Sequence, residues 1–367
     1  MVTSSPDFGR LRKALMLEGE PDRVPLVEAG IEREIKEQFL GRSLRTVADE
    51  VEFWATAGYD YVSITAGFRR ALWRGFATSS AELAKKQESL TTALGAEYGL
   101  GGEVRERAWA SEGKGLIASK ADFDAFPWPE PEDLIPYDQF AETEKHLPKG
   151  MKVIAYVGYV YTPVWWLMGF EGFTNALADD PDLVARLFAK VGEIQMRVFE
   201  KLIEIPSVGA VWHPDDIAYT EGLIVSPKLL RRHVFPWYRR MGEVCKARGI
   251  PYMLHTDGDV SEVMDDIVGC HFNALHPFEP KAMDIVAAKR EYGDRLCVIG
   301  NIDLGYTLTL GTPEEVEAEV RERIRALAPG GGYCLSSSNS VTEYVPFANY
   351  MAMREATLKY GKYPIQP

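Results

Sequence analysis

The chain has 367 residues, of which 46% are hydrophobic and 26% are charged, and its formal net charge is -13. This composition is typical of a soluble globular protein with a large core, and the negative charge disfavours nucleic acid as a partner. We expect no membrane span, because no apolar stretch reaches the ~20 residues that cross a bilayer. The polar start of the chain and its four widely spaced cysteines favour a cytoplasmic protein with reduced thiols.

Eight short runs of β-forming residues recur along the chain, and helical patterns separate most of them. The runs begin at Val24, Tyr59, Lys152, Val208, Pro251, Phe272, Arg295 and Gly331. Alternating strands and helices indicate a parallel sheet covered by helices, and eight strands are the number that closes a barrel. We therefore predict an α/β fold, a (β/α)8 TIM barrel in which residues 1–367 form a single domain.

Helix-start signals support this alternation. Asp180, Ser226 and Thr312 each stand directly before a proline, as N-cap residues do, and each begins a helical pattern. Residues 4–23 form a further predicted helix, an N-terminal extension that would close the end of the barrel opposite its active site.

The connection between the second and third predicted strands is too long for one crossover. We interpret residues from about 66 to 150 as an insertion over one barrel mouth. Within it, residues 91–109 are typical of a glycine-turned antiparallel pair, and residues 126–138 of an extended proline-rich segment.

Polar residues follow each predicted strand, at the end where a barrel of this kind builds its active site. These residues are Glu28, Thr65, Tyr159, Tyr161, His213, Asp215, Asp216, His255, Asp257, His276, Glu279, Asn301, Asp303, Ser336, Ser337, Ser338 and Asn339. The predicted substrate-binding set is Glu28, Tyr159, Tyr161, His213, Asp215, His276, Asn301, Asp303, Ser337 and Asn339.

His255, Asp257 and Glu279 form the predicted catalytic set. Imidazole and carboxylate groups are ligands that zinc and similar divalent ions accept, so the same three residues are candidate metal ligands, with Cys334 as a further candidate. They could instead exchange protons without a metal. Each also has a structural interpretation, in which His255 is a hydrogen-bonded barrel residue and Asp257 or Asp215 caps a turn or helix.

The segment from Tyr156 to Phe170 is unusually aromatic. Aromatic clusters more often pack in a core than bind a ligand, but this one begins at a strand end, so a flat or apolar ligand could stack there. Neither a G-x-G-x-x-G motif after a strand nor a phosphate-loop motif is present, which disfavours a nucleotide site.

Several ordered motifs resemble the uroporphyrinogen decarboxylase superfamily, which also contains methyltransferases that act on methylated cobamides. The motifs are DDIAYTEGLIVSPKLLRRHVFPWYRRM, YMLHTDGDVSEVMDDIVG, VIGNIDLGYTLTLGTPEEVEAEV, APGGGYCLSSSNSVTEYVPFANYMAM and KYGKYPI. The resemblance covers nearly the whole second half of the chain and extends loosely to VPLVEAG near its start. It implies a (β/α)8 barrel, the architecture that the strand count also predicts.

The chain departs from both branches of this superfamily. The decarboxylases resemble one another in an N-terminal arginine loop that holds substrate carboxylates, whereas Arg33 lies too far along to match it, and they carry a histidine where this chain has SSSNSV. The methyltransferases match His255, but Asp257 and Gly331 stand roughly where they have zinc-binding cysteines. The resemblance therefore argues against the thiolate zinc site of the methyltransferases and leaves open a site for a divalent metal, zinc among the candidates, with nitrogen and oxygen ligands from His255, Asp257 and Glu279.

We therefore hypothesise a methyltransferase that moves a methyl group between a small methoxylated or methylated compound, or a folate, and a corrinoid on a partner protein. His255, Asp257 and Glu279 would polarise the atom that gains or loses the methyl group, while Glu28 and Asn301 would position the substrate. The alternatives are a decarboxylase of uroporphyrinogen or another carboxylated substrate, and a non-catalytic binder of a corrinoid or corrinoid protein. We expect a homodimer, the commonest oligomer.

Overall fold

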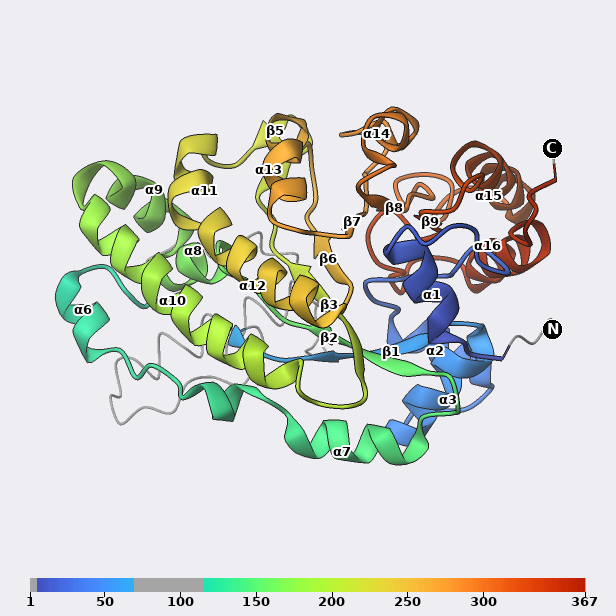
Figure 1. Cartoon of the computed structure of the whole chain (residues 1–367), viewed down its shortest axis with the longest axis horizontal. Helices are drawn as coiled ribbons and strands as arrows, with labels where there is room; N and C mark the ends of the chain where they lie inside the picture. The colour runs from blue at the N-terminus through green and yellow to red at the C-terminus, as the bar shows by residue number, and fades with distance from the viewer. Residues whose placement is uncertain (1–4, 69–114, 367) are drawn as a thin grey trace.

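The computed structural model describes residues 5–68 and 115–366, and these residues form a curled, parallel, seven-stranded sheet with helices around it (Figure 1). The strands pair in chain order, each parallel to the next. They are β1 (Tyr61–Thr65), β2 (Lys152–Tyr156), β3 (Val208–Pro214), β6 (Tyr252–His255), β7 (Ala274–His276), β8 (Cys297–Ile299) and β9 (Tyr333–Cys334). An antiparallel hairpin of β4 (Ala218–Tyr219) and β5 (Gly222–Leu223) follows β3. All carboxyl ends of the parallel strands therefore lie at one edge of the sheet.

Most of the helices connect successive strands, while α1, α2 and α3 precede β1 and α16 follows β9 (Figure 1). They are α1 (Phe8–Leu15), α2 (Arg33–Leu40), α3 (Val47–Ala57), α6 (Lys120–Ala125), η1 (Pro131–Leu134), α7 (Tyr137–His146), α8 (Thr162–Met168), α9 (Phe170–Asp179), α10 (Pro181–Leu202), α11 (Pro227–His233), α12 (Phe235–Arg248), η2 (Ser261–Val263), α13 (Met264–Gly269), α14 (Ile285–Tyr292), α15 (Pro313–Leu327) and α16 (Phe347–Tyr360). Within the described residues, none of these helices has the length and apolar character needed to span a membrane.

Capping side chains set several of the helix starts that the sequence predicts. The Asp180 carboxylate accepts a backbone N–H in the first turn of α10, and Thr312 and Glu315 form a reciprocal capping box at α15. The single helix predicted before β6 is divided into α11 and α12 at Val234. Pro236 explains the division, because it supplies no N–H for a continuous helix.

The first of the eight predicted strands does not form, so a closed eight-stranded barrel is not confirmed. This segment pairs with the β9 side through an isolated parallel bridge between Leu26 and Leu335. On its other side, the Tyr61 hydroxyl of β1 accepts the Glu28 N–H and donates to the Glu28 carbonyl, both at 2.8 Å. Pro25 offers no N–H, which interrupts a regular ladder at the second residue of the predicted strand.

The predicted insertion is described only from residue 115 onward, and the predicted antiparallel pair at 91–109 lies outside the described residues. The described part contains α6, η1 and α7. The prediction of an extended segment over 126–138 is wrong in part, because η1 occupies Pro131–Leu134 and α7 begins at Tyr137. Proline is compatible with the first position of η1, since no helical hydrogen bond is made there.

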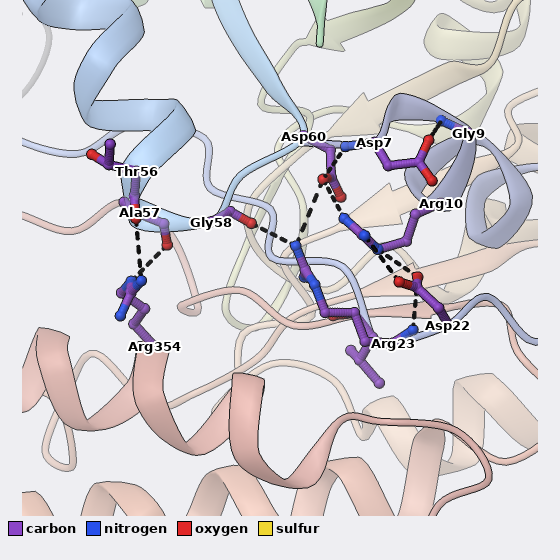
Figure 2. Close-up of polar contacts among 11 residues, drawn as sticks. Asp7, Gly9, Arg10, Asp22, Arg23, Thr56, Ala57, Gly58, Asp60 and Arg354 are labelled. Atoms are coloured by element: carbon purple, nitrogen blue, oxygen red, sulfur yellow. Dashed lines mark hydrogen bonds and ion pairs between the residues drawn. The ribbon is translucent and has the colours of Figure 1, made fainter. Parts of the chain in front are cut away.

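The helix predicted over residues 4–23 is shorter in the structure, where α1 spans Phe8–Leu15 and lies at the end of the sheet opposite the carboxyl ends of the strands. The Phe8 N–H donates to the Gly150 carbonyl at 2.7 Å, shortly before β2. The Asp7 N–H donates to Asp60 Oδ1 at 2.9 Å, directly before β1 (Figure 2). The start of α1 is therefore tied to the amino ends of two neighbouring strands.

Buried ion pairs reinforce this end of the molecule, as Figure 2 shows. Arg10 donates to Asp22 at 2.5 Å and to the fully buried Asp60 at 2.6 Å, and Arg23 lies 3.6 Å from Asp60. On α16, Arg354 donates to the last carbonyls of α3. Because each of these arginines is bound to protein oxygens at the amino ends of the strands, we interpret the group as a structural clamp.

Candidate functional site

A cavity of about 590 Å³ opens at the carboxyl ends of the strands, a volume typical of small-molecule sites. Residues that follow β2, β3, β6, β7, β8 and β9 line it. The predicted site residues among them are Tyr159, His255, Asp257, Glu279, Asp303 and Asn339. Six of the predicted site residues therefore share one cavity at this edge of the sheet.

The other predicted site residues do not line this cavity. They are Glu28, Tyr161, His213, Asp215, His276, Asn301, Ser337 and Cys334, and all are buried. Asn301 donates to the Phe278 carbonyl at 2.6 Å, and Cys334 Sγ lies 4.0 Å from Cys297 Sγ. Cys334 is thus a buried thiol away from the cavity lining, and the structure gives no support to it as a metal ligand.

Three residues of the cavity form a compact group of possible metal ligands. Asp216, His255 and Asp257 each bring one ligand atom to within 4.8 Å of the others. His255 Nε2 lies 3.8 Å from Asp216 Oδ1 and 3.7 Å from Asp257 Oδ1. His255 ends β6, Asp257 follows it, and Asp216 follows the neighbouring strand β3, whose pairing with β6 brings the two strand ends together. We call them the donor cluster.

The donor cluster fits a divalent metal ion. Asp257 Oδ1 is buried and has no hydrogen-bond partner in the part of the chain that the structure describes. Zinc bonds of ~2.0–2.2 Å place tetrahedral ligand atoms roughly 3.4 Å apart, and His255 Nε2 lies 3.7 and 3.8 Å from the two carboxylate oxygens, so a small inward movement would suit such an ion. An imidazole and two carboxylates favour a metal that accepts nitrogen and oxygen ligands.

Glu279, the predicted third ligand, is not part of the donor cluster. Its Oε2 accepts the Gly258 N–H at 2.7 Å, which holds it beside the turn that follows Asp257. Asp216 takes its place in the cluster. The sequence placed Asp216 at a strand end, but it could not show which carboxylate of the Asp215-Asp216 pair faces the cavity.

Several carboxylates lie close together in the cavity, and the pKa values of two of them, Asp257 and Glu279, are raised. Burial raises the pKa of Asp257 well above its ordinary value, Asp216 and Glu279 raise it further, and the hydrogen bond from Asn339 at 2.8 Å opposes this. Burial also raises the pKa of Glu279, against the hydrogen bond from Gly258, and Asp216 adds to the increase. This environment favours a bound cation or a retained proton.

Behind His255, a chain of hydrogen bonds leads from the cavity into the core. His255 Nδ1 lies 2.7 Å from His276 Nδ1, and His276 Nε2 lies 3.0 Å from Ser336 Oγ. Ser336 donates to Glu28 Oε2 at 3.3 Å, and Ser337 donates its N–H at 2.9 Å and its hydroxyl at 2.6 Å to the same carboxylate. Glu28 and His276, predicted to bind substrate, therefore lie one layer beneath the cavity.

Burial sets the charge of two members of this hydrogen-bond chain, His276 and Glu28. It lowers the pKa of His276 well below its ordinary value, and the neighbouring His255 lowers it further, so His276 is neutral. Burial raises the pKa of Glu28 to about 8, against the hydrogen bonds from Ser337 and Ser336.

A second buried network shapes the loop between β2 and α8. The Asp215 carboxylate accepts the N–H groups of residues 160–162 at 2.6–2.7 Å and the Tyr238 hydroxyl at 2.8 Å. Burial alone would raise the pKa of Asp215, but the interaction with His213 and these hydrogen bonds lower it. Asp215 therefore binds the backbone at the start of α8 and holds in place the loop that carries Tyr159, a structural role, although Tyr161 and not Asp215 is the N-cap residue of α8.

The cavity lining is acidic. Its carboxylates belong to Glu32, Asp216, Asp257, Glu279 and Asp303. Apart from His255, Lys281 is the single basic side chain among the lining residues that the structure describes. Tyr156, Tyr159 and Tyr344 add aromatic surface to the same walls.

Comparisons with known proteins add evolutionary context to this geometry. The sequence model of the uroporphyrinogen decarboxylase (URO-D) family matches residues 99–360. Methylcobamide:CoM methyltransferase MtaA from Methanosarcina barkeri is 24% identical over 205 residues, which are 52% of this chain and 57% of MtaA. A uroporphyrinogen decarboxylase from Chlorobaculum parvum is 24% identical over 235 residues, which are 58% of this chain and 62% of that protein.

A solved methyltransferase from Methanosarcina mazei has the same fold, with a TM-score of 0.64 at 16% identity, over 96% of this chain and 98% of that structure. The chain spans about three fifths of the length of the two curated relatives, which have different activities. The family match, in contrast, extends over well more than half of the chain. The chain therefore belongs to the uroporphyrinogen decarboxylase family.

Proposed function

We propose that this protein is a methyltransferase that moves a methyl group between a small methoxylated or methylated compound, or a folate, and a corrinoid on a partner protein. The observation that carries the proposal is the donor cluster of Asp216, His255 and Asp257 in the cavity. These residues would hold a divalent metal such as zinc. Such an ion, when bound, supplies a Lewis acid that stabilises negative charge on the atom that loses the methyl group.

The other cavity residues have separate roles in this proposal. In the demethylating direction, the bond between the methyl carbon and the donor oxygen or nitrogen breaks, and its electron pair stays on that heteroatom. The electron pair of the new cobalt–carbon bond comes from Co(I) of the corrinoid, which acts as co-substrate. Glu279, whose pKa is raised and which lies outside the donor cluster, would give the heteroatom its proton, and Tyr159 would pack against the donor.

The charge of the cavity disfavours the decarboxylase alternative. Uroporphyrinogen carries several carboxylates, and a site for it needs cations to balance them. Among the described lining residues there are five carboxylates, and Lys281 is the single basic side chain apart from His255. Like charges brought close together destabilise a complex, so a methyl donor whose reacting part is neutral or cationic suits the cavity better than a polycarboxylate.

Methyl transfer to cob(I)alamin tests the proposed reaction directly. We expect at least one donor in a panel of methoxylated aromatics, methylated amines, methylated thiols and methyltetrahydrofolate to yield methylcobalamin, followed by its absorbance. His255→Ala should lower the rate by more than ~100-fold, because a Lewis acid contributes several kcal/mol to such a step. His146→Ala, the same change on the exposed face of α7, is the matched control and should have no effect.

The two alternatives give different results in the same experiment. Consumption of uroporphyrinogen with no methyl transfer from any donor would establish the decarboxylase. Tight corrinoid binding without turnover, unchanged in His255→Ala, would establish the non-catalytic binder.

The metal content of the purified protein tests the donor cluster separately. We expect about one divalent ion per chain by plasma mass spectrometry, lost in His255→Ala and in Asp257→Asn and retained in His146→Ala. Protein that stays metal-free after repletion and desalting would show that these side chains act as acids, bases or substrate contacts instead.

A further inference from the structure

The buried hydrogen-bond chain behind His255 determines more than its position. We infer that Glu28, Ser336 and His276 form a positioning relay that fixes the tautomer of His255, with the proton on Nδ1 and the Nε2 lone pair directed at the donor cluster. The inference deepens the proposed function, because it concerns the same cluster, but the tautomer exists whether or not methyl transfer occurs.

The direction of each hydrogen bond follows from the chemistry of Glu28. A carboxylate only accepts hydrogen bonds, so the Ser336 hydroxyl donates to it. Ser336 Oγ then has lone pairs left to accept the His276 Nε2 proton. A neutral imidazole has one protonated nitrogen, so His276 Nδ1 accepts, and His255 Nδ1 must donate to it. His255 Nε2 is left without a proton, as a metal ligand or a base requires.

Burial keeps water from competing for these hydrogen bonds, so their direction is maintained. Glu28, His276 and Ser336 are fully buried, whereas the His255 side chain is 12% exposed, at the cavity. The Tyr61 hydroxyl holds the main chain of Glu28 at both its N–H and its carbonyl, and two bonds from Ser337 hold its carboxylate. The relay therefore starts from the fixed Glu28 carboxyl group and ends at His255, the member of the relay that reaches the cavity.

Protonation of Glu28 does not reverse the relay. A proton on Oε1, which also accepts the Ser337 N–H, would leave Oε2 to accept from both serine hydroxyls, so only a proton on Oε2 could change the direction. The nearer hydroxyl oxygen to Oε2 is that of Ser337, at 2.6 Å, compared with 3.3 Å for Ser336. The carboxyl proton goes to Ser337, and Ser336 still donates to the remaining lone pair of Oε2.

Glutamine at position 28 should reverse the relay. Its carbonyl oxygen must accept the Ser337 N–H, which places the amide NH2 where Oε2 was. The NH2 group donates to Ser336, Ser336 donates to His276 Nε2, and His276 Nδ1 then donates to His255 Nδ1. In Glu28→Gln, His255 carries its proton on Nε2, directed at the carboxylates of the donor cluster.

The experiment is a long-range proton–nitrogen NMR spectrum of the full, metal-free chain labelled with ¹⁵N-histidine, which separates protonated from bare ring nitrogens. The His255 signals are identified by their loss in His255→Gln. We expect Nδ1 protonated and Nε2 bare in the native chain, and the opposite in Glu28→Gln. Zn²⁺ affinity, measured by competition with a chelating dye, should fall roughly 10–100-fold in Glu28→Gln, as for other changes behind a metal ligand.

Two serine variants complete the test and guard against misfolding of Glu28→Gln. Ser336→Ala cuts the relay at a second point and should leave His255 as a mixture of tautomers. Ser207→Ala removes another buried serine hydroxyl, one without a hydrogen-bond partner in the described part of the chain, and should change nothing. A bare Nδ1 in the native chain, or His255 nitrogens unchanged in both Glu28→Gln and Ser336→Ala, would overturn the inference.

Discussion

Burial of Glu28 couples the charge of one side chain to the stability of the whole chain. Its pKa is about 8 in the folded protein, against 4.5 ordinarily, so folding favours the protonated form. A raised carboxyl pKa contributes stability that is fully present below pH 4.5 and is lost as the pH rises through 8. Relative to Glu28→Gln, the free energy of unfolding of the native protein should fall by on the order of 3 kcal/mol between pH 6 and pH 9.

Urea denaturation at the two pH values measures this difference. Glu322→Gln, the same change on an exposed side chain of α15, should track the native protein within about 0.5 kcal/mol at both. A difference between native protein and Glu28→Gln that stays constant with pH would mean that Glu28 titrates near its ordinary value.

For single residues, the sequence predicts which side chains lie at a strand end more reliably than it predicts the role of each. His255 and Asp257 could be predicted as neighbours at a site because a strand end leaves few directions for the next side chains. The choice between Asp216 and Glu279 as third ligand depends on distances across two loops, which spacing along the chain does not encode. Burial of Glu28 beneath the cavity was equally hidden, because it results from packing between segments more than 300 residues apart.

Among the elements, the loop between β2 and α8 depends on a glycine. Gly158 has a φ of +144°, and an added Cβ would lie 2.2 Å from Nδ1 of the buried His213. Gly158→Ala should therefore cost roughly 2–5 kcal/mol of stability by strain and overpacking. It should also lower activity at permissive temperature, because Tyr159 of the cavity follows directly.

Gly172→Ala provides the matched control for this loop. Gly172 lies in α9, and an added Cβ there meets nothing within 4 Å. Alanine should raise stability by about 0.5–1 kcal/mol there, since it is the better helix former. Thermal denaturation of both variants separates these outcomes, and equal effects would show that the Gly158 position is not strained.

The elements themselves were largely predictable, and the exceptions have local causes. Seven of the eight predicted strands form. Each is a short apolar run that ends in polar residues, which is the pattern of a buried parallel strand. The missing one contains Pro25, and the divided helix contains Pro236; both prolines remove an N–H that a regular element needs. The sequence shows these prolines. Tertiary packing decides whether an element tolerates its proline, is divided by it or becomes irregular.

In the whole molecule, the candidate site and the buried ion pairs lie at opposite ends of the sheet. The cavity and donor cluster lie at the carboxyl ends of the strands, and the arginine clamp of Figure 2 lies at their amino ends. Changes in the clamp should therefore alter stability and leave the proposed metal site intact. This division is the one expected of barrel-like folds.

Two arginines on α1 test this division with the same substitution. The Arg10 side chain is 6% exposed and binds the buried Asp60, whereas the Arg12 side chain is 39% exposed and binds Glu18 at 2.5 Å. Arg10→Ala leaves a buried carboxylate short of a partner and should cost about 3–5 kcal/mol, while Arg12→Ala should cost less than about 1 kcal/mol. Urea denaturation gives both values, and metal content per folded chain at 25 °C should equal that of the native protein in both variants. Loss of metal from folded Arg10→Ala would show that the two ends of the sheet are coupled.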